Sequence, residues 1–173
     1  MRTLRAVALM GVAALALSAP AVQAAPAGPE EDARQLEIQA RQLAENHQAY
    51  RQAAELYRKA AKLYGPSLEA AAAHAQAGKM AFYDRDNRAT DDMKRAGDMA
   101  AAFGHVALAA ESYLDGAWLA QREGLLQTAV DLATRADRLT DSPLLAEADR
   151  DALKRRIAER AEDMTGQEAV VRR

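Results

Sequence analysis

Small and apolar residues recur at spacings of three and four along most of this chain, which is the period of an amphipathic helix. Breakers and caps divide the pattern into segments. Gly65-Pro66-Ser67 and Asp141-Ser142-Pro143 each end one helix and cap the next. Further stops fall at 84–87, at Gly104 and at Gly124. The predicted helices are 30–46, 49–64, 68–83, 88–103, 105–122, 125–140 and 144–163.

Three of these helices share one spacing of inward positions, alanine, then an apolar residue four further on, then alanine three beyond that. The offset between the first and second copy is 36 residues, and between the second and third it is 40. Each copy follows a helix that carries a small residue, at Ala40, Ala77 and Ala117. The pattern indicates one helical hairpin repeated three times. The triplets are Ala53, Tyr57, Ala60; Ala89, Met93, Ala96; and Ala129, Ala133, Ala136.

Composition supports helices and argues against strands. The chain has 173 residues, of which 44 are alanine and 5% are aromatic. Valine and isoleucine, the residues that favour strands, occur only six times beyond residue 24. We therefore expect an all-α fold of three stacked antiparallel hairpins, closed by a C-terminal capping helix whose outer side meets water.

The segment Tyr50–Tyr64 resembles the second-helix signature of the tetratricopeptide repeat family, and residues 124–136 resemble it again with Gly124 at the turn. The resemblance covers about residues 34–143 and implies a right-handed α-solenoid. Three departures are visible. The offsets of 36 and 40 exceed the family's roughly 34 residues, Arg41 stands where that family has a small residue, and Asp84 replaces the turn glycine of the middle unit.

In that family the first helix of each hairpin lines a concave groove that accepts a peptide or a partner helix. Trp118, the only tryptophan, follows Ala117 directly and is expected to point away from the packed crossing as a binding anchor. Packing of Trp118 against the next helix is the alternative. The resemblance places eight residues on or near the groove: Gln35, Ile38, Gln42, His74, Phe82, Leu114, Trp118 and Gln121.

The N-terminus has the pattern of a cleavable export signal over residues 1–24. Arg2 and Arg5 precede an uncharged apolar run, and Val22-Gln23-Ala24 has the small-x-small form of a cleavage site. The run, 6–17, is shorter than the roughly 20 residues that span a membrane, so no stable anchor should remain after cleavage. We expect a bacterial periplasmic or secreted protein with a flexible linker at 25–30, a repeat domain at 31–163 and a disordered tail at 164–173.

Motifs for catalysis or ligand binding are not evident in the sequence. The chain has no cysteine, no glycine-rich phosphate loop and no nucleophile motif, and its three histidines share no metal-ligand spacing. Carboxylate pairs such as Asp91-Asp92 are expected on polar surfaces. After cleavage 21 basic residues face 25 acidic ones, without the basic face that nucleic acid requires.

These observations favour a non-enzymatic scaffold, with no catalytic residue, metal or cofactor, that binds another protein or peptide of the cell envelope. The alternative is a compact helical bundle that binds a small ligand or a metal.

Overall fold

The computed structural model describes residues 28–45 and 49–171, with side chains described up to Arg160. The predicted leader, 1–24, lies outside these residues. The described part of the chain is all-helical and contains no strand. Its seven helices are α1 (Pro29–Glu45), α2 (Tyr50–Tyr64), α3 (Leu68–Tyr83), α4 (Ala89–Ala102), α5 (Val106–Arg122), α6 (Leu126–Thr140) and α7 (Glu147–Val171).

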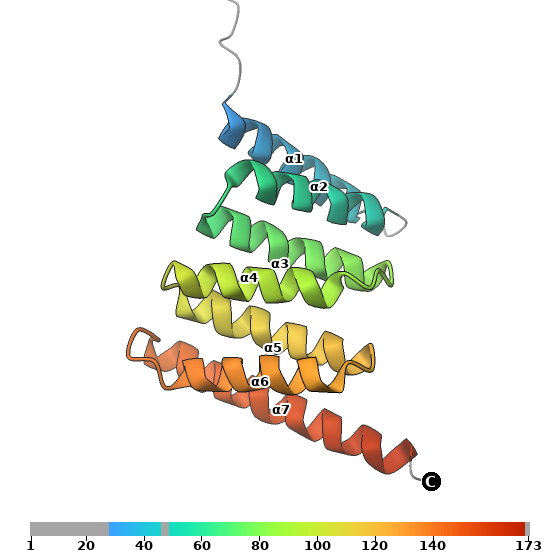
Figure 1. The fold of residues 1–173 in the computed structure, drawn as a ribbon, viewed down its shortest axis with the longest axis vertical. Helices are drawn as coiled ribbons and strands as arrows, with labels where there is room; N and C mark the ends of the chain where they lie inside the picture. The colour runs from blue at the N-terminus through green and yellow to red at the C-terminus, as the bar shows by residue number, and fades with distance from the viewer. Residues whose placement is uncertain (1–27, 46–48, 172–173) are drawn as a thin grey trace, which may run out of the picture.

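The helices are stacked in chain order along the long axis, with α1 and α7 at opposite ends (Figure 1). Each helix from α1 to α5 packs along the next one, α3 also contacts α5, and α7 makes smaller contacts with both α5 and α6. Helices α2, α4 and α6 form a second-helix layer on the near side, and α1, α3, α5 and α7 form a first-helix layer behind it (Figure 1). The hairpins therefore form an open stack, in which the ends do not meet.

The second-helix layer has the register that the sequence predicts. The pattern of buried and exposed positions in α2 recurs in α4 after 36 residues and in α6 after a further 40. Ala53, Ala89 and Ala129 are therefore equivalent, and all three are buried. Alanine at these positions lets neighbouring helices approach at the close end of the roughly 8–10 Å interaxial range.

In the first-helix layer, the register of α5 differs by one residue from the predicted register. The buried pattern of α1 recurs in α3 after 37 residues and in α5 after a further 39, as the equivalent positions Ala33, Ala70 and Ala109 show. Ala77 consequently corresponds to Gly116 and not to Ala117. A Cβ atom on Gly116 would lie 3.1 Å from Met93 Cβ and from a methyl group of Leu132, so α5 crosses α4 and α6 very closely at this point.

Two turns show how the chain reverses between helices. Ser67 caps α3 as predicted, because its hydroxyl accepts a hydrogen bond from the Ala70 amide at 3.1 Å. The turn after α3 contains a left-handed residue, but this is Arg85, with φ of 58°, and not Asp84. Gly124 occupies the same place after α5 with φ of 77°, where glycine has no steric penalty.

The C-terminal helix differs from the prediction at both of its ends. It begins at Glu147 and not at 144, because Arg150 donates hydrogen bonds to the carbonyls of Thr140, Ser142 and Leu145 and so holds 141–146 as a turn. It continues to Val171, where a disordered tail was predicted from 164. No proline interrupts 147–171, and a single glycine is tolerated within a helix. Within the described residues, no helix has the length and apolar character needed to cross a membrane.

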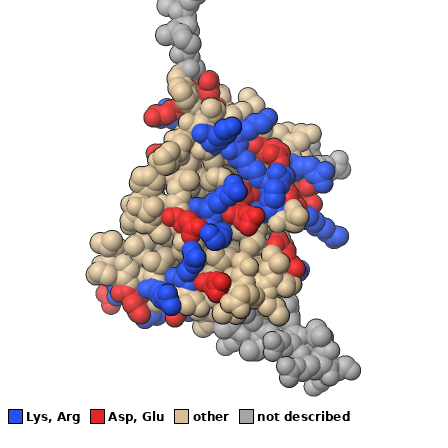
Figure 2. Space-filling view, viewed as in Figure 1, with Lys and Arg blue, Asp and Glu red and all other residues tan. Residues whose placement is uncertain are grey.

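The second-helix layer presents basic and acidic side chains side by side (Figure 2). Many of them pair between consecutive hairpins, as in Arg51–Asp84 at 2.8 Å and Arg135–Asp98 at 2.8 Å. These ion pairs are exposed and individually contribute about 0–1 kcal/mol. The surface visible in Figure 2 is therefore of mixed charge.

Candidate functional site

A large hollow lies between α3 and α5, and we call it the α3–α5 cleft. It consists of two open compartments of about 840 and 240 Å³ that share Phe82, Tyr83 and Leu119 in their walls. The larger compartment also touches the turns that follow α3 and α5, and the smaller one reaches α7. The remaining lining includes Lys79, Arg85, Asp86, Asp115, Trp118, Arg122, Glu123 and Arg160.

Aromatic rings form a continuous row beside this cleft. Ring centroids are 5.0 Å apart between Tyr50 and Tyr83, 5.6 Å between Tyr83 and Phe82, and 5.0 Å between Phe82 and Trp118. The chain has eight aromatic residues in all, so half of them gather here. Tyr83 is 58% exposed, whereas Phe82 and Trp118 are half-buried. The row offers a rigid apolar surface at low cost in side-chain entropy.

Two arginines stack on the indole of Trp118. The guanidinium carbon of Arg122, one helical turn along α5, lies 4.9 Å from the ring centroid, and that of Arg160 on α7 lies 4.6 Å away. The neighbouring Arg156 on α7 bonds to Glu111 and Asp115 on α5, both at 3.0 Å. Arginine side chains of α7 therefore attach it to α5 at the edge of the cleft, and they hold Trp118 in one orientation.

A second hollow of about 530 Å³ lies between α1 and α3 in the same layer. It is lined by Tyr57 of α2, by Ala72 and Met80 of α3, and by Glu37 and Arg41 of α1. Together with the α3–α5 cleft, this hollow extends along most of the first-helix layer. On its α1 side, the Glu37 carboxylate accepts a hydrogen bond from the Tyr64 hydroxyl at 3.1 Å, and burial together with this carboxylate raises the pKa of Tyr64 to about 12.

The structure brings together only part of the predicted groove. Phe82 and Trp118 are adjacent and line the α3–α5 cleft. Leu114 is 3% exposed within the core and cannot line a groove, because the α5 register differs by one residue from the predicted one. Gln121 is half-buried and does not line either hollow. Three α1 residues, Gln35, Ile38 and Gln42, are exposed but lie outside the α1 wall of the second hollow.

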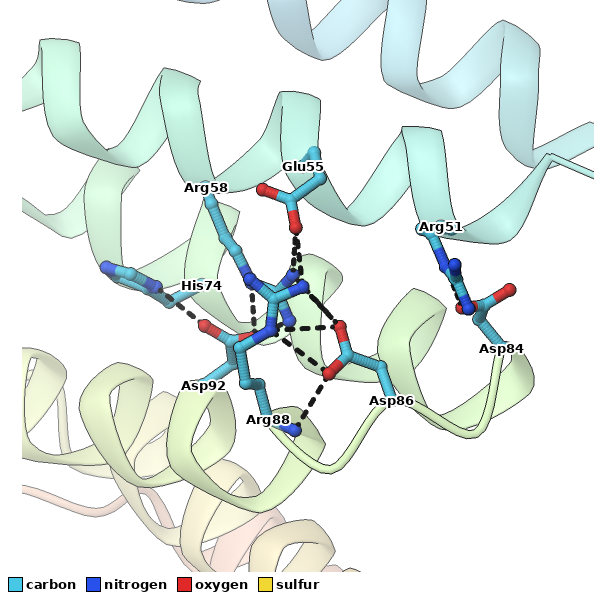
Figure 3. A network of polar contacts seen from close by, with 8 residues as sticks. All are labelled: Arg51, Glu55, Arg58, His74, Asp84, Asp86, Arg88 and Asp92. Carbon is cyan, nitrogen blue, oxygen red and sulfur yellow. Dashed lines mark hydrogen bonds and ion pairs between the residues drawn. The ribbon is translucent and has the colours of Figure 1, made fainter.

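His74 lines neither hollow and belongs to a polar network between the first two hairpins (Figure 3). Its Nδ1 lies 3.4 Å from Asp92 Oδ1, without hydrogen-bond geometry to any described group. Arg58 on α2 donates to Asp92 at 2.6 Å and to Asp86 at 3.2 Å. Arg88 also donates to Asp86, and this hydrogen bond is the main cause that lowers the Asp86 pKa to about 2.

Asp92 occupies an apolar position of the repeat. Its equivalents in α2 and α6 are Leu56 and Leu132, of which Leu132 is 1% exposed. The Asp92 side chain is itself only 4% exposed, so the expectation that Asp91-Asp92 lies on a polar surface is wrong for Asp92. Burial of a carboxylate requires a paired cation, and Arg58 supplies it. The network thus joins hairpins, and it meets the α3–α5 cleft at Asp86, which lines the larger compartment.

Sequence reasoning missed several residues of the α3–α5 cleft, namely Lys79, Tyr83, Arg85, Arg122 and Arg160. Arg122 could have been found, because it lies four residues after Trp118 and therefore on the same side of the helix. Arg160 belongs to a helix joined to α5 only in three dimensions, so no local pattern indicates it.

Comparisons with protein-family models, with curated proteins and with solved structures found no match. Among the described residues, no group of three or more histidine and carboxylate side chains is placed to hold a metal ion. The residues of the cleft therefore provide the basis for a functional proposal.

Proposed function

We propose that this protein is a non-enzymatic interaction scaffold that holds a peptide or a helix of a partner protein in the α3–α5 cleft. The observation that carries the proposal is the aromatic row, which ends at Trp118 in an accessible cleft of about 840 and 240 Å³. Tryptophan, tyrosine and arginine are the residues that most often dominate binding energy at protein interfaces. Here Tyr83, Trp118 and Arg122 would supply that energy.

The stacked hairpins support the same proposal of a peptide-binding scaffold. The burial pattern recurs through three hairpins, and each hairpin contributes its first helix to the hollowed layer. We propose that the stack is a right-handed superhelix of the tetratricopeptide kind, with that layer on its concave side. Consecutive units then contact only their neighbours, and the groove grows with each unit.

We further propose that the chain is exported in a bacterium. The charged start, the apolar run 6–17 and the site before Ala25 support this. The mature protein would then act in the periplasm or outside the cell, on another protein of the cell envelope.

Site-specific photo-crosslinking in the producing cell tests the binding proposal. A photoreactive phenylalanine analogue replaces Tyr83, which is exposed in the cleft, or Leu63, which is 41% exposed on α2 in the other layer. The proposal predicts a discrete adduct at position 83 that is absent at position 63. Adducts of equal yield at both positions, or only at position 63, would contradict it.

A further inference from the structure

Four cations surround the α3–α5 cleft without a carboxylate partner among the described residues. Lys79 on α3, Arg85 in the following turn, Arg122 on α5 and Arg160 on α7 line the cleft. None of them forms an ion pair within the described part of the chain, although most other arginines of the first two hairpins do. Arg122 and Arg160 contact the neutral Trp118 ring, and no described carboxylate pairs with either of them.

Two of the three carboxylates that line the same cleft are already paired with cations. Asp115 pairs with Arg156 at 3.0 Å, and Asp86 pairs with Arg58 and Arg88 at 3.2 and 2.7 Å. Glu123 accepts a hydrogen bond from the neutral Thr90 hydroxyl at 2.9 Å and has no cation partner among the described residues. Among the described residues, four unpaired cations and one unpaired carboxylate therefore line the cleft beside an apolar aromatic row, even though the whole chain has a net charge of −2.

We propose that the α3–α5 cleft selects an acidic segment of the partner, with its carboxylates on these cations and an apolar side chain on the aromatic row. The inference rests on the proposed function, since it names the chemistry of the peptide in the same cleft. Arginine forms forked hydrogen bonds with carboxylates, which gives geometric as well as electrostatic selection.

A peptide fits this lining better than a nucleic acid does. Asp115, Glu123 and Asp86 stand among the cations, so a chain with a phosphate at every residue would meet these carboxylates repeatedly. An acidic peptide can place its charges at intervals and fill the space between them with apolar side chains. The mixture of aromatic rings, cations and carboxylates matches that alternation.

Fluorescence of Trp118 reports binding directly, because the chain has no other tryptophan. The experiment titrates the protein with a 12-residue peptide of alternating glutamate and leucine with one phenylalanine. Two matched peptides replace every glutamate with glutamine or with lysine, and a thymidine 12-mer is a fourth ligand. Each titration is run between about 0.05 and about 0.5 M salt, over which screening of exposed charges increases strongly.

The proposal predicts that the acidic peptide binds at least about tenfold more tightly than the glutamine peptide and loses affinity as salt rises. The lysine peptide should bind most weakly. Equal affinity for the acidic and glutamine peptides, or no effect of salt, would overturn the charge selection while leaving a peptide cleft intact. Absence of binding by all three peptides would count against the proposed function as well. Tighter binding of the thymidine 12-mer than of any peptide would contradict the proposal and indicate that the cleft binds nucleic acid.

Two substitutions test whether a cation of the cleft causes the preference for the acidic peptide. Arg122→Gln removes one of the four cations, whereas Arg138→Gln removes an exposed arginine of α6 that also lacks an ion pair among the described residues. Both positions are exposed, so both variants should keep the helical circular dichroism of the parent. The proposal expects Arg122→Gln to weaken binding of the acidic peptide by a larger factor than binding of the glutamine peptide, and Arg138→Gln to change neither. The same loss in both variants would contradict it.

Discussion

Arg58 on α2 and Asp92 on α4 form an ion pair between the first two hairpins, with Nη2 and Oδ2 2.6 Å apart. Asp92 stands at a position that Leu56 and Leu132 occupy in the other hairpins. The pair therefore replaces apolar packing at one junction of the stack. Its charges are largely withdrawn from water, since the two side chains are 14% and 4% exposed.

Asp92→Ala should lower the free energy of unfolding by on the order of 3 kcal/mol, because it leaves the half-buried Arg58 without its closest partner. Asp91→Ala, a change at the exposed neighbouring position, is the control and should change stability by less than about 0.5 kcal/mol. Urea unfolding followed by circular dichroism measures both. A loss smaller than about 1 kcal/mol for Asp92→Ala would show that Asp92 is not needed for the junction.

Gly97→Ala should destabilise the protein by about 1–3 kcal/mol through overpacking, although alanine favours helix over glycine by up to about 1 kcal/mol. A Cβ atom at position 97 would lie 2.5 Å from the ring of Tyr113, and Tyr113 is fixed by its hydrogen bond to Asp98 at 2.7 Å. The control is the same change in a Tyr113→Leu background, where the clash is absent and alanine should be neutral or stabilising. Equal effects in both backgrounds would contradict the steric explanation.

Stability should decline in acid partly through Asp86. The hydrogen bond from Arg88 lowers the pKa of Asp86 from its ordinary 3.8 to about 2, so its contribution is present above pH 4 and is lost as the pH falls through about 2. The contribution is about 2 kcal/mol, since one pKa unit corresponds to roughly 1.4 kcal/mol. Asp86→Asn should be less stable than the parent at pH 6 and should lose less stability between pH 4 and 2. Parallel pH profiles for the two proteins would exclude Asp86 as the cause.

Export predicts a processed N-terminus. Mass spectrometry of the protein recovered from its producing cell should give a chain that begins at Ala25. Replacement of Ala24 by a bulky residue such as Phe should leave the leader attached, because the cleavage site requires small side chains. A chain that retains Met1 or Arg2 in the parent would contradict the proposal.

The helices could be predicted from the sequence because their breakers are local. Gly65-Pro66-Ser67, Gly104 and Gly124 end helices wherever the rest of the chain lies, and the repeated alanines fix the second-helix register. The first-helix register could not be fixed in the same way. Gly116 and Ala117 are adjacent and both small, so a pattern of small residues cannot distinguish them, and only the crossing with Met93 selects Gly116.

The site was less predictable than the fold. Trp118 could be named because it is the only tryptophan of the chain and directly follows the small residue Ala117. Arg160 contacts Trp118 from α7, and Tyr83 lines the same cleft from α3, so both join the site through packing between separate helices, which no local spacing encodes. Asp92 resembles a surface residue in sequence because its neighbour Asp91 is one, and its partner Arg58 lies 34 residues away.

The central claim is tested most directly by measuring how tightly the Trp118→Ala variant binds the partner that is captured at position 83. Circular dichroism is recorded on the same samples. Trp118 contacts Phe82, Arg122 and Arg160 at the edge of the stack, so its removal should preserve the helices. We predict that Trp118→Ala lowers the affinity at least about tenfold with unchanged helicity, while Leu63→Ala has no effect. Unchanged affinity, or a loss that accompanies loss of helicity, would place Trp118 in the core and not in a binding cleft.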